Sequence, residues 1–352
     1  MLKKLLCAFV IGSLARPASA QKEETPPFSI IYSTRHPEAV FDLEENPPVI
    51  ARMVEQLVMA ATGRPDAASG WRTLVSPQDR VGIKVSAAGG RYFSTHPAVV
   101  NAIVAGLESA GIPRSRVIVW DRDPEKLAEA QFVGRPGNYQ VRGVAGPKDY
   151  DRKAPVLAPV LGRLIWGDAL FDEKQRKTLG AAPDASSLLS STSYIATVLS
   201  REVTKVINVP VLSDEAQCGV AGAFYNMTVP NLDNWRRFTQ PGLSGPESLP
   251  EVYADENIGP KVVLHIMDGL VAQYAHGPRG NGNYAFAHNT LYASKDPVAL
   301  DTHAFRLIES WRVEAKLPRM EGRADWLRTA AEIGLGQSDP ARIRLQPVAL
   351  SK

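Results

Sequence analysis

The sequence predicts an α/β fold in which helices cover a mostly parallel βαβ sheet. Short apolar runs rich in β-branched residues, such as residues 81–85 and 206–209, are typical of strands that are buried on both faces. Between the runs lie longer segments whose apolar residues recur at helical spacing, for example residues 97–110. Residues 80–122 show the order strand, loop, helix, strand. This order is that of a βαβ unit and therefore indicates parallel strands.

The first twenty residues have the features of a secretory signal peptide. Lys3 and Lys4 precede an apolar run over residues 5–14, and Ala18-Ser19-Ala20 follows as a small-residue cleavage site. The apolar run is too short for a permanent transmembrane helix. We expect cleavage after Ala20, a flexible lead over residues 21–27, and an α/β domain over 28–352. The expected location is periplasmic or extracellular.

Charge and cysteine content exclude some classes of protein. The chain has 40 basic and 37 acidic residues, and loss of Lys3, Lys4 and Arg16 with the signal would make the numbers equal. A neutral chain without a basic run does not predict a nucleic-acid partner. Cys218 would be left without a second cysteine for a disulfide, so the core must supply the stability. A hydrophobic content of 44% is enough for one large domain or two lobes.

The N-terminal third is the most regular part of the chain. Residues 28–32 are a candidate strand, and a helix with apolar positions at Ile50, Val54 and Leu57 begins after Pro47 and Pro48. The strand over 80–85 comes next. A helix then begins at Pro97 and ends at Gly111, and a strand follows over 116–120.

The remainder is less regular. Residues 131–187 contain scattered glycine and proline, with possible strands near 139–144 and 161–166, and we interpret them as an insertion or lid. A helix is expected near 192–202, a strand over 261–267 and a short strand over 291–294. Two more helices are expected, over 297–312 and near 322–334.

The stretch over 205–234 has two interpretations. A buried strand ends at Pro210, a polar turn follows at 213–215, and the small residues 219–223 open a helix. Such a strand–turn–helix junction is a common ligand site in α/β proteins. The same glycines would also suit a tight crossover that only packs helix against strand. Both interpretations stay open on the sequence.

Several acidic and histidine side chains are candidates for chemistry. Asp301 falls within the apolar arc of its helix, so it needs partners, either at a site or on the backbone amides of a neighbouring loop. His265 and Asp268 are three apart on one strand and should face opposite sides of the sheet. We expect Asp268 at the carboxyl end of its strand, facing a ligand, and His265 in the core.

Other candidates are weaker. The glycine-rich loop over 277–283, with Arg279, is either an anion cradle or, as we favour, a plain loop. His276, His288, Asp301 and His303 lack the spacing of a metal site, so no metal is predicted and the cofactor stays unknown. Cys218 has no histidine near it in sequence, and a buried thiol is the favoured interpretation.

Taken together, the motifs resemble the family called domain of unknown function 362. The resemblance is carried by VGIKV (81–85), STHPAVVNAIVAGLESAG (94–111), KVINVPVL (205–212), GVAGAFYNM (219–227) and SKDPVALD (294–301), in the order in which the family has them. It implies an α/β fold but no general activity. Many members carry cysteine-rich ferredoxin-type motifs, and this chain has none, so an iron–sulfur cluster is not expected. A fold-level similarity links these segments to the substrate domain of nickel-dependent lactate racemases, which does not define a reaction.

The chain departs from the family within 205–234. Relatives commonly have Lys-x-His after the strand, where this chain has Ser213, Asp214 and Glu215. They also commonly have lysine before the asparagine, where this chain has Tyr225 before Asn226. The resemblance therefore implies that an anion held by those cations is bound differently here, or not at all.

Two hypotheses follow. The first is an exported enzyme that acts on a small, carboxylate-bearing organic substrate in a cleft at the carboxyl ends of the strands. His96 and Asp268 would be its general acid and base, Asp301 a further catalytic candidate, and Lys84 with the helix start at Pro97 would hold an anion. The ligand-binding candidates are Lys84, Ser94, Thr95, Asp121, Asn208, Asp214, Tyr225 and Asn226. The alternative is a non-catalytic small-ligand-binding protein of the same fold.

Overall fold

The structure is a computed structural model that describes residues 28–134, 137–156, 192–239 and 245–350, with the backbone alone at 165–166 and 189–190. Its main sheet has nine strands, in the order β15-β1-β14-β13-β11-β4-β5-β6, with β12 paired to β13. The pairings β1–β14 and β13–β14 are antiparallel, and the other pairs of this sheet are parallel. The expectation of a mostly parallel α/β sheet is therefore confirmed.

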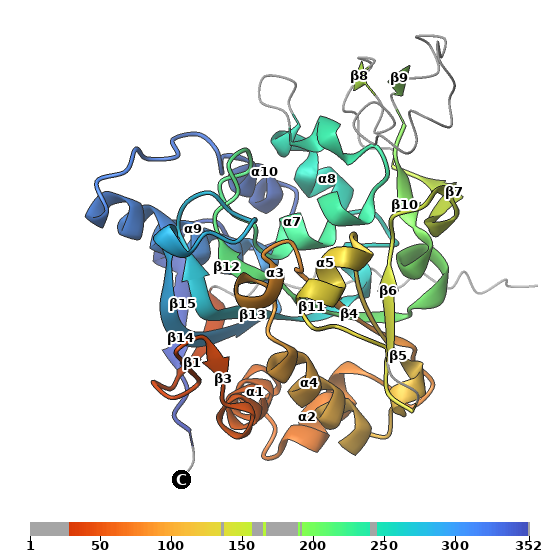
Figure 1. The fold of residues 1–352 in the computed structure, drawn as a ribbon, viewed down its shortest axis with the longest axis vertical. Helices are drawn as coiled ribbons and strands as arrows, with labels where there is room; N and C mark the ends of the chain where they lie inside the picture. The colour runs from red at the N-terminus through yellow and green to blue at the C-terminus, as the bar shows by residue number, and fades with distance from the viewer. Residues whose placement is uncertain are drawn as a thin grey trace, which may run out of the picture.

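Helices cover both faces of this sheet (Figure 1). One layer contains α1 (Pro47–Thr62), α2 (Ala67–Leu74) and α4 (Pro97–Ser109). The opposite layer contains α7 (Ala223–Met227), α8 (Leu249–Tyr253), α9 (Pro297–Glu314) and α10 (Trp326–Glu332). Each layer has its own hydrophobic core against the sheet. A side chain on a central strand therefore belongs to one core or the other, according to its alternation.

The expected βαβ unit is present. Helix α4 connects β4 (Val81–Val85) to β5 (Val117–Asp121), and the two strands pair in parallel. The apolar face of α4 is fully buried, with Val99, Ile103 and Leu107 inaccessible to solvent. Gly106 permits the close approach of α4 to α2, because a Cβ there would lie 2.1 Å from Nε1 of Trp71.

The C-terminal half differs from expectation in three elements. Strands β13 (Val262–Gln273) and β14 (Ala285–Ser294) are longer than the predicted strands and form an antiparallel hairpin. Asp268 and Gly269, which marked a strand end in the sequence, lie inside β13. The segment near 192–202 contains β10 (Tyr194–Ala196) and a π-helix over Val198–Glu202 rather than one helix.

Short elements complete the fold. The expected insertion over 131–187 includes β6 (Gln140–Gly143) and β7 (Tyr150–Pro155), while most of its second half lies outside the described residues. Strands β8 (Ile165–Trp166) and β9 (Leu189–Ser190) pair with each other. The others are β1 (Ser29–Arg35), β2 (Val40–Phe41), β3 (Glu44–Glu45), α3 (Gly90–Phe93), α5 (Pro124–Glu129), β11 (Lys205–Val209), β12 (Val211–Ser213) and β15 (Ile343–Pro347). Within the described residues, no helix is long and apolar enough to cross a membrane.

Candidate functional site

Most predicted site residues lie where β4, β5 and β11 end, beside the middle of β13. Helices α3 and α5 lie in front of this edge of the sheet in Figure 1. The polar side chains beneath them are buried: Lys84 and Asn208 are inaccessible to solvent, and Asp121 and Asp268 nearly so. Buried polar groups need partners, so their hydrogen bonds show which of them can still serve a ligand.

Lys84 has no donor left for a ligand. Its Nζ donates to Oδ1 of Asp121 at 2.7 Å, to Oδ1 of Asn226 at 3.0 Å and to the carbonyl of Val85 at 2.7 Å. These three bonds use the three protons of the ammonium group. Burial lowers the pKa of Lys84, and the charge of Asp121 opposes that effect. The second oxygen of Asp121 accepts from the backbone N–H of Ala87 at 2.7 Å.

The same network continues along β11 and β13. Nδ2 of Asn226 donates to Oδ1 of Asn208 at 2.7 Å, and Nδ2 of Asn208 lies 3.0 Å from Nδ1 of His265. Because the amide nitrogen can only donate, Nδ1 of His265 accepts, and Nε2 carries the proton toward the hydroxyl of Tyr253 at 3.2 Å. Burial lowers the pKa of His265 to about 3, so it is neutral. The expectation of a core histidine is met.

Asp301 binds backbone rather than the network. Its two oxygens accept from the N–H groups of Ala223 at 2.6 Å and Phe224 at 3.0 Å, at the start of α7. Burial raises the pKa of Asp301 to about 7, and the two amides oppose that rise. Gly222 leaves room for this contact, because a Cβ there would lie 2.0 Å from Oδ1. Of the two interpretations of Asp301, the geometry favours the one in which it holds a loop.

His96 and Asp268 form a pair on the other face of the sheet. Oδ2 of Asp268 accepts from the backbone N–H of His96 at 2.7 Å and lies 2.9 Å from Nδ1 of its ring. Since a carboxylate only accepts, Nδ1 carries a proton, and Nε2 makes no hydrogen bond within the described residues. Burial lowers the pKa of His96, but Asp268 and then Glu45 raise it, and the net direction is upward.

Glu45 joins this pair from the β2–β3 hairpin. Its Oε2 accepts from the N–H of Ala98 at 2.8 Å, in the first turn of α4. Burial raises the pKa of Glu45, and the positive charge of His96 opposes the rise. Asp268 and Glu45 thus occupy the helix start that was expected to hold an anion, so that part of the prediction is wrong. The sequence holds no signal for Glu45 as a site residue, because only the fold brings it near His96.

The predicted residues therefore do not line one cleft. Lys84 alternates with Ile83 and Val85, which belong to the core under α1 and α4, so it faces α7. His265 faces α8 and Asp268 faces α4, as their spacing of three predicted. The expectation of a single cleft at the carboxyl ends is corrected to two groups on opposite faces. Of these two groups, the one around His96 keeps an uncommitted titratable nitrogen. Elsewhere in the described structure, Nε2 of His303 is also buried without a hydrogen-bond partner.

Ser94 and Thr95 precede His96. The hydroxyl of Thr95 donates to the carbonyl of Val209 at 2.8 Å and accepts from the N–H of Ser86 at 2.9 Å, which ties β4, β11 and the start of α4 together. Oγ of Ser94 is buried and has no hydrogen-bond partner within the described structure. Thr95 is thus committed to the fold, whereas Ser94 retains a free hydroxyl.

Asp214 holds the glycine-rich loop that follows β13. Its Oδ1 accepts from the N–H of Gly277 at 2.8 Å, and a Cβ on that glycine would lie 2.1 Å from Oγ of Ser213. Burial raises the pKa of Asp214 to about 6. Side-chain groups of Gln273 bind the backbone of Arg279 and Asn281 in the same loop. The favoured interpretation of residues 277–283, an ordinary loop, agrees with these contacts.

The residues that replace the family's usual cations have mixed roles. Oε2 of Glu215 accepts from the N–H groups of Gln217 at 2.7 Å and Cys218 at 2.6 Å, and so closes the turn. Cys218 is buried, and burial and Glu215 raise the pKa of its thiol, opposite to an activated cysteine. Tyr225 is partly accessible, and burial followed by the charge of Glu215 raises its pKa.

The suggested metal ligands are not assembled. Among the described residues, no group of three or more histidine, cysteine, aspartate or glutamate side chains is arranged to hold a metal ion. His288 bonds to the hydroxyl of Tyr292 at 2.8 Å, and His303 packs edge-on against the same ring. His276 packs on Tyr284, away from Asp301.

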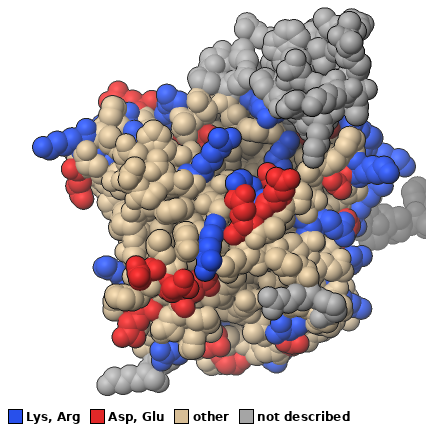
Figure 2. All heavy atoms as spheres, in the orientation of Figure 1, with Lys and Arg blue, Asp and Glu red and all other residues tan. Residues whose placement is uncertain are grey.

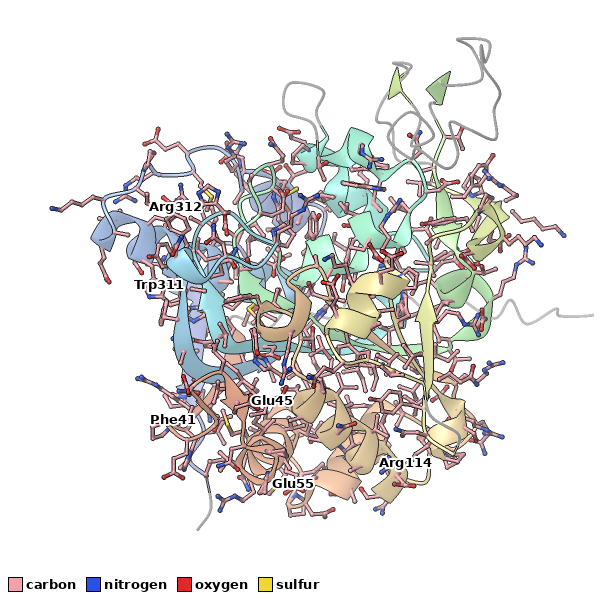
Figure 3. The ribbon with its side chains drawn as sticks, viewed as in Figure 1. Phe41, Glu45, Glu55, Arg114, Trp311 and Arg312 are labelled. Atoms are coloured by element: carbon pink, nitrogen blue, oxygen red, sulfur yellow. The ribbon has the colours of Figure 1, made fainter. Side chains whose placement is uncertain are left out.

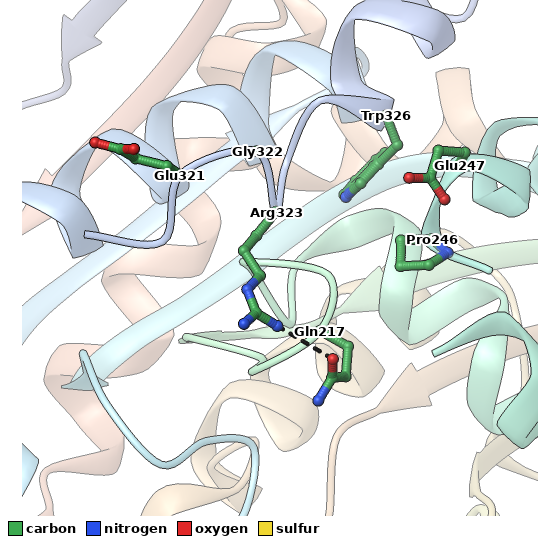
Figure 4. A pocket seen from close by; sticks show the side chains of 7 residues that line it. All are labelled: Gln217, Pro246, Glu247, Glu321, Gly322, Arg323 and Trp326. Carbon is green, nitrogen blue, oxygen red and sulfur yellow. Dashed lines mark hydrogen bonds between the residues drawn. The ribbon is translucent and has the colours of Figure 1, made fainter. Parts of the chain in front are cut away.

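A surface pocket lies beyond the turn at Gln217 (Figure 4). The guanidinium of Arg323 donates to Oε1 of Gln217 at 3.1 Å across it, and the indole of Trp326 donates to the carbonyl of Cys218 at 2.9 Å. None of the predicted site residues lines this pocket, whose lining is Gln217, Pro246, Glu247, Glu321, Gly322, Arg323 and Trp326.

Fold and site together define an α/β protein with a buried polar edge and one oriented histidine. Residues 176–306 match the family model described as domain of unknown function (DUF362), which confirms the resemblance over that range. A crystal structure of a Thermotoga maritima protein is similar at 9% identity and a TM-score of 0.42. The similarity covers 78% of this chain and 60% of that protein, and is too distant to bear on function. No curated protein matches the sequence.

We expect Lys84→Met to lower the free energy of unfolding by about 3–5 kcal/mol, because it leaves the Asp121 charge buried without its partner. Adding Asp121→Asn removes that charge and keeps an acceptor for Ala87, so the double variant should be more stable than the single one. Urea unfolding followed by circular dichroism measures both. Equal stability of the two variants would contradict a role for the buried charge.

We expect Asp301→Ala to cost about 2–4 kcal/mol, because it leaves the N–H groups of Ala223 and Phe224 buried and unpaired. Asp325→Ala is the matched control, since Asp325 is exposed and its side chain makes no capping bond to α10. Urea midpoints compare the variants. A loss in Asp301→Ala no larger than that in the control would refute the capping role.

Asp214 should make stability depend on pH between about 4 and 6. Its native pKa is raised from 3.8 to about 6, so the native state keeps a proton that the unfolded chain loses, and this stabilisation is full below 3.8 and lost by about pH 6. Asp214→Asn keeps the acceptor for Gly277 and removes this dependence. Its stability relative to the native chain should rise across that window, by about 3 kcal/mol at most. Parallel pH profiles of unfolding for the two proteins would be the contrary result.

Proposed function

We propose that this protein is an enzyme that moves a proton to or from a small organic substrate, with His96 as its general acid or base. One observation carries the proposal. Asp268 binds both the ring Nδ1 and the backbone N–H of His96, which fixes the imidazole, and Nε2 has no hydrogen-bond partner in the part of the chain that the structure describes. A carboxylate that orients a histidine in this way is a recurring device for acid–base catalysis.

The electrostatics suit that role. The pKa of His96 is raised from its usual value by Asp268 and Glu45 despite burial, so the ring changes charge above pH 6.5. A general acid or base works best when its pKa lies near the working pH. The side chain of His96 is 5% exposed, which limits access to a small substrate.

The proposal includes an exported location, supported by the signal-like features of residues 1–20. The sequence predicted a substrate carboxylate that would bind Lys84 and the start of α4. Both are already hydrogen-bonded to protein groups, so neither supports a carboxylate on the substrate. The charges around His96 are therefore the better guide to the substrate.

A second candidate is a non-catalytic protein that binds a small ligand. It is favoured by the exchange of the family's usual cations for Ser213, Glu215 and Tyr225. The structure adds that Glu215 is committed to its own turn. This candidate predicts binding without turnover.

The deciding experiment screens a panel of small metabolites for turnover and compares the native chain with His96→Gln. We expect turnover to fall about 10²–10⁴-fold, because a positioned proton donor or acceptor contributes that much. His303→Gln, on α9 in the helix layer opposite α4, is the control and should be unaffected. Full turnover in His96→Gln would overturn the proposal, and binding without turnover by the native chain would favour the second candidate.

The pH profile gives an independent readout. Asp268→Asn keeps an acceptor for the N–H of His96 but removes the charge that raises its pKa, so the limb of the pH–rate profile assigned to His96 should move to lower pH. A limb that stays in place would show that Asp268 does not act through His96.

A further inference from the structure

The side chains whose charges act on His96 are acidic. Asp268 on β13 and Glu45 on β3 are the groups that act on His96, and those that act on Glu45 are His96, Asp268 and Glu44. Lysine and arginine do not figure among them. When both carboxylates are ionised, the trio of His96, Asp268 and Glu45 carries one net negative charge with His96 protonated and two with His96 neutral.

Two polar atoms of this trio have no partner in the described structure. Oε2 of Glu45 is used by Ala98, and Oε1 makes no bond. Nε2 of His96 is likewise unbound, and the ring is 95% buried. His96 and Glu45 influence each other electrostatically, but no hydrogen bond or ion pair joins them. A ligand that reaches both side chains would find an unused acceptor on Glu45 and an unused ring nitrogen on His96.

The approach to the trio is also acidic. Figure 2 shows acidic side chains gathered over the β2–β3 hairpin, beside a basic side chain over α3. Glu38, Asp42 and Glu44 are exposed on this segment, and Arg91 of α3 pairs with Glu44 at 3.7 Å. On the same hairpin, Glu45 lies toward α4 while Phe41 lies at the outer edge (Figure 3). Acidic lining raises the local concentration of cations.

We propose that the substrate class of the His96 site is a small primary amine, whose ammonium group pairs with Glu45 beside Nε2 of His96. The inference rests on the proposed function for the role of His96 as general acid or base. The choice of an amine rests on the carboxylate of Glu45. A carboxylate ligand would meet the carboxylates of Asp268, which is buried, and of Glu45, which is half-buried. An ammonium group supplies the donors that Oε1 of Glu45 lacks, and a charge-assisted bond of this kind is strong when it is shielded from water.

A purely structural role for Glu45 explains less. Capping the start of α4 takes one oxygen, and a short side chain next to the helix is the usual means. Here the carboxylate comes from a hairpin 53 residues away, and its second oxygen remains unbound beside a histidine that is also unbound. The two unused atoms are what a ligand would complete.

The test uses probes that share one skeleton: benzylamine, benzoate and benzyl alcohol. Binding to the full chain is measured by isothermal calorimetry and by the shift in melting temperature. We expect benzylamine to bind at least tenfold more tightly than the other two. Preference for benzoate, or no binding by any of the three, would overturn the inference.

Variants locate the contact. Glu45→Gln keeps an acceptor for Ala98 and removes the charge, so it should fold and lose at least tenfold in benzylamine affinity. Glu38→Gln, on the exposed part of the same segment, is the matched control and should keep the affinity within about twofold. Equal losses in both variants would mean general attraction rather than a contact with Glu45, and would overturn the proposal.

The experiments distinguish an error in the amine inference from an error in the proposed enzyme function. Amine binding that depends on Glu45, without turnover of any amine, supports this inference and refutes the enzyme. Turnover that depends on His96, with a substrate that lacks a cationic group, supports the enzyme and refutes this inference.

Discussion

The ammonium group of Lys84 is the constraint on which the polar edge of the sheet depends. A charge that is inaccessible to solvent must have every proton bound, and Lys84 achieves this with Asp121 on β5, Asn226 on α7 and a carbonyl of its own strand. Asn226 then fixes Asn208, and Asn208 fixes His265. One buried charge thus sets the positions of two neighbouring strands, the short helix above them and the histidine beyond.

The two faces of the sheet differ in how far their polar groups are bonded within the protein. On the face covered by α7 and α8, carboxylate, amide and imidazole groups are consumed by one another or by helix starts, as with Asp301 at α7. On the face covered by α4, Asp268 and Glu45 cap the helix, but His96 and Glu45 each keep one atom free. Neither of these two atoms is fully buried, so both can be reached by a ligand, and function is best sought under α4.

The stretch over 205–234 illustrates the difference between a motif and a site. Its glycines serve packing: Gly222 admits the carboxylate of Asp301, and Gly219, at φ 81°, lies against Phe305. Its asparagines serve the Lys84 network. Of the residues that stand where relatives commonly have cations, Glu215 closes a turn. Of the two interpretations of this stretch, the contacts favour the one in which it packs helix against strand and supports the Lys84 network. His96, the proposed acid–base residue, lies outside this stretch.

The amino-acid sequence by itself determined the α/β class, the βαβ unit around α4 and the opposite directions of His265 and Asp268, because these follow from periodicity along a short segment. It also singled out His96 and Asp268. It did not place Asp268 inside a strand, since an Asp-Gly pair is typical of a strand end. The bonds that make a carboxylate tolerable there come from His96 and from the backbone N–H of Leu270. The sequence also could not show that Glu45 lies near His96, or that all three N–H groups of Lys84 are used within the protein. Those outcomes depend on contacts between segments far apart in the chain, which the tertiary structure alone decides.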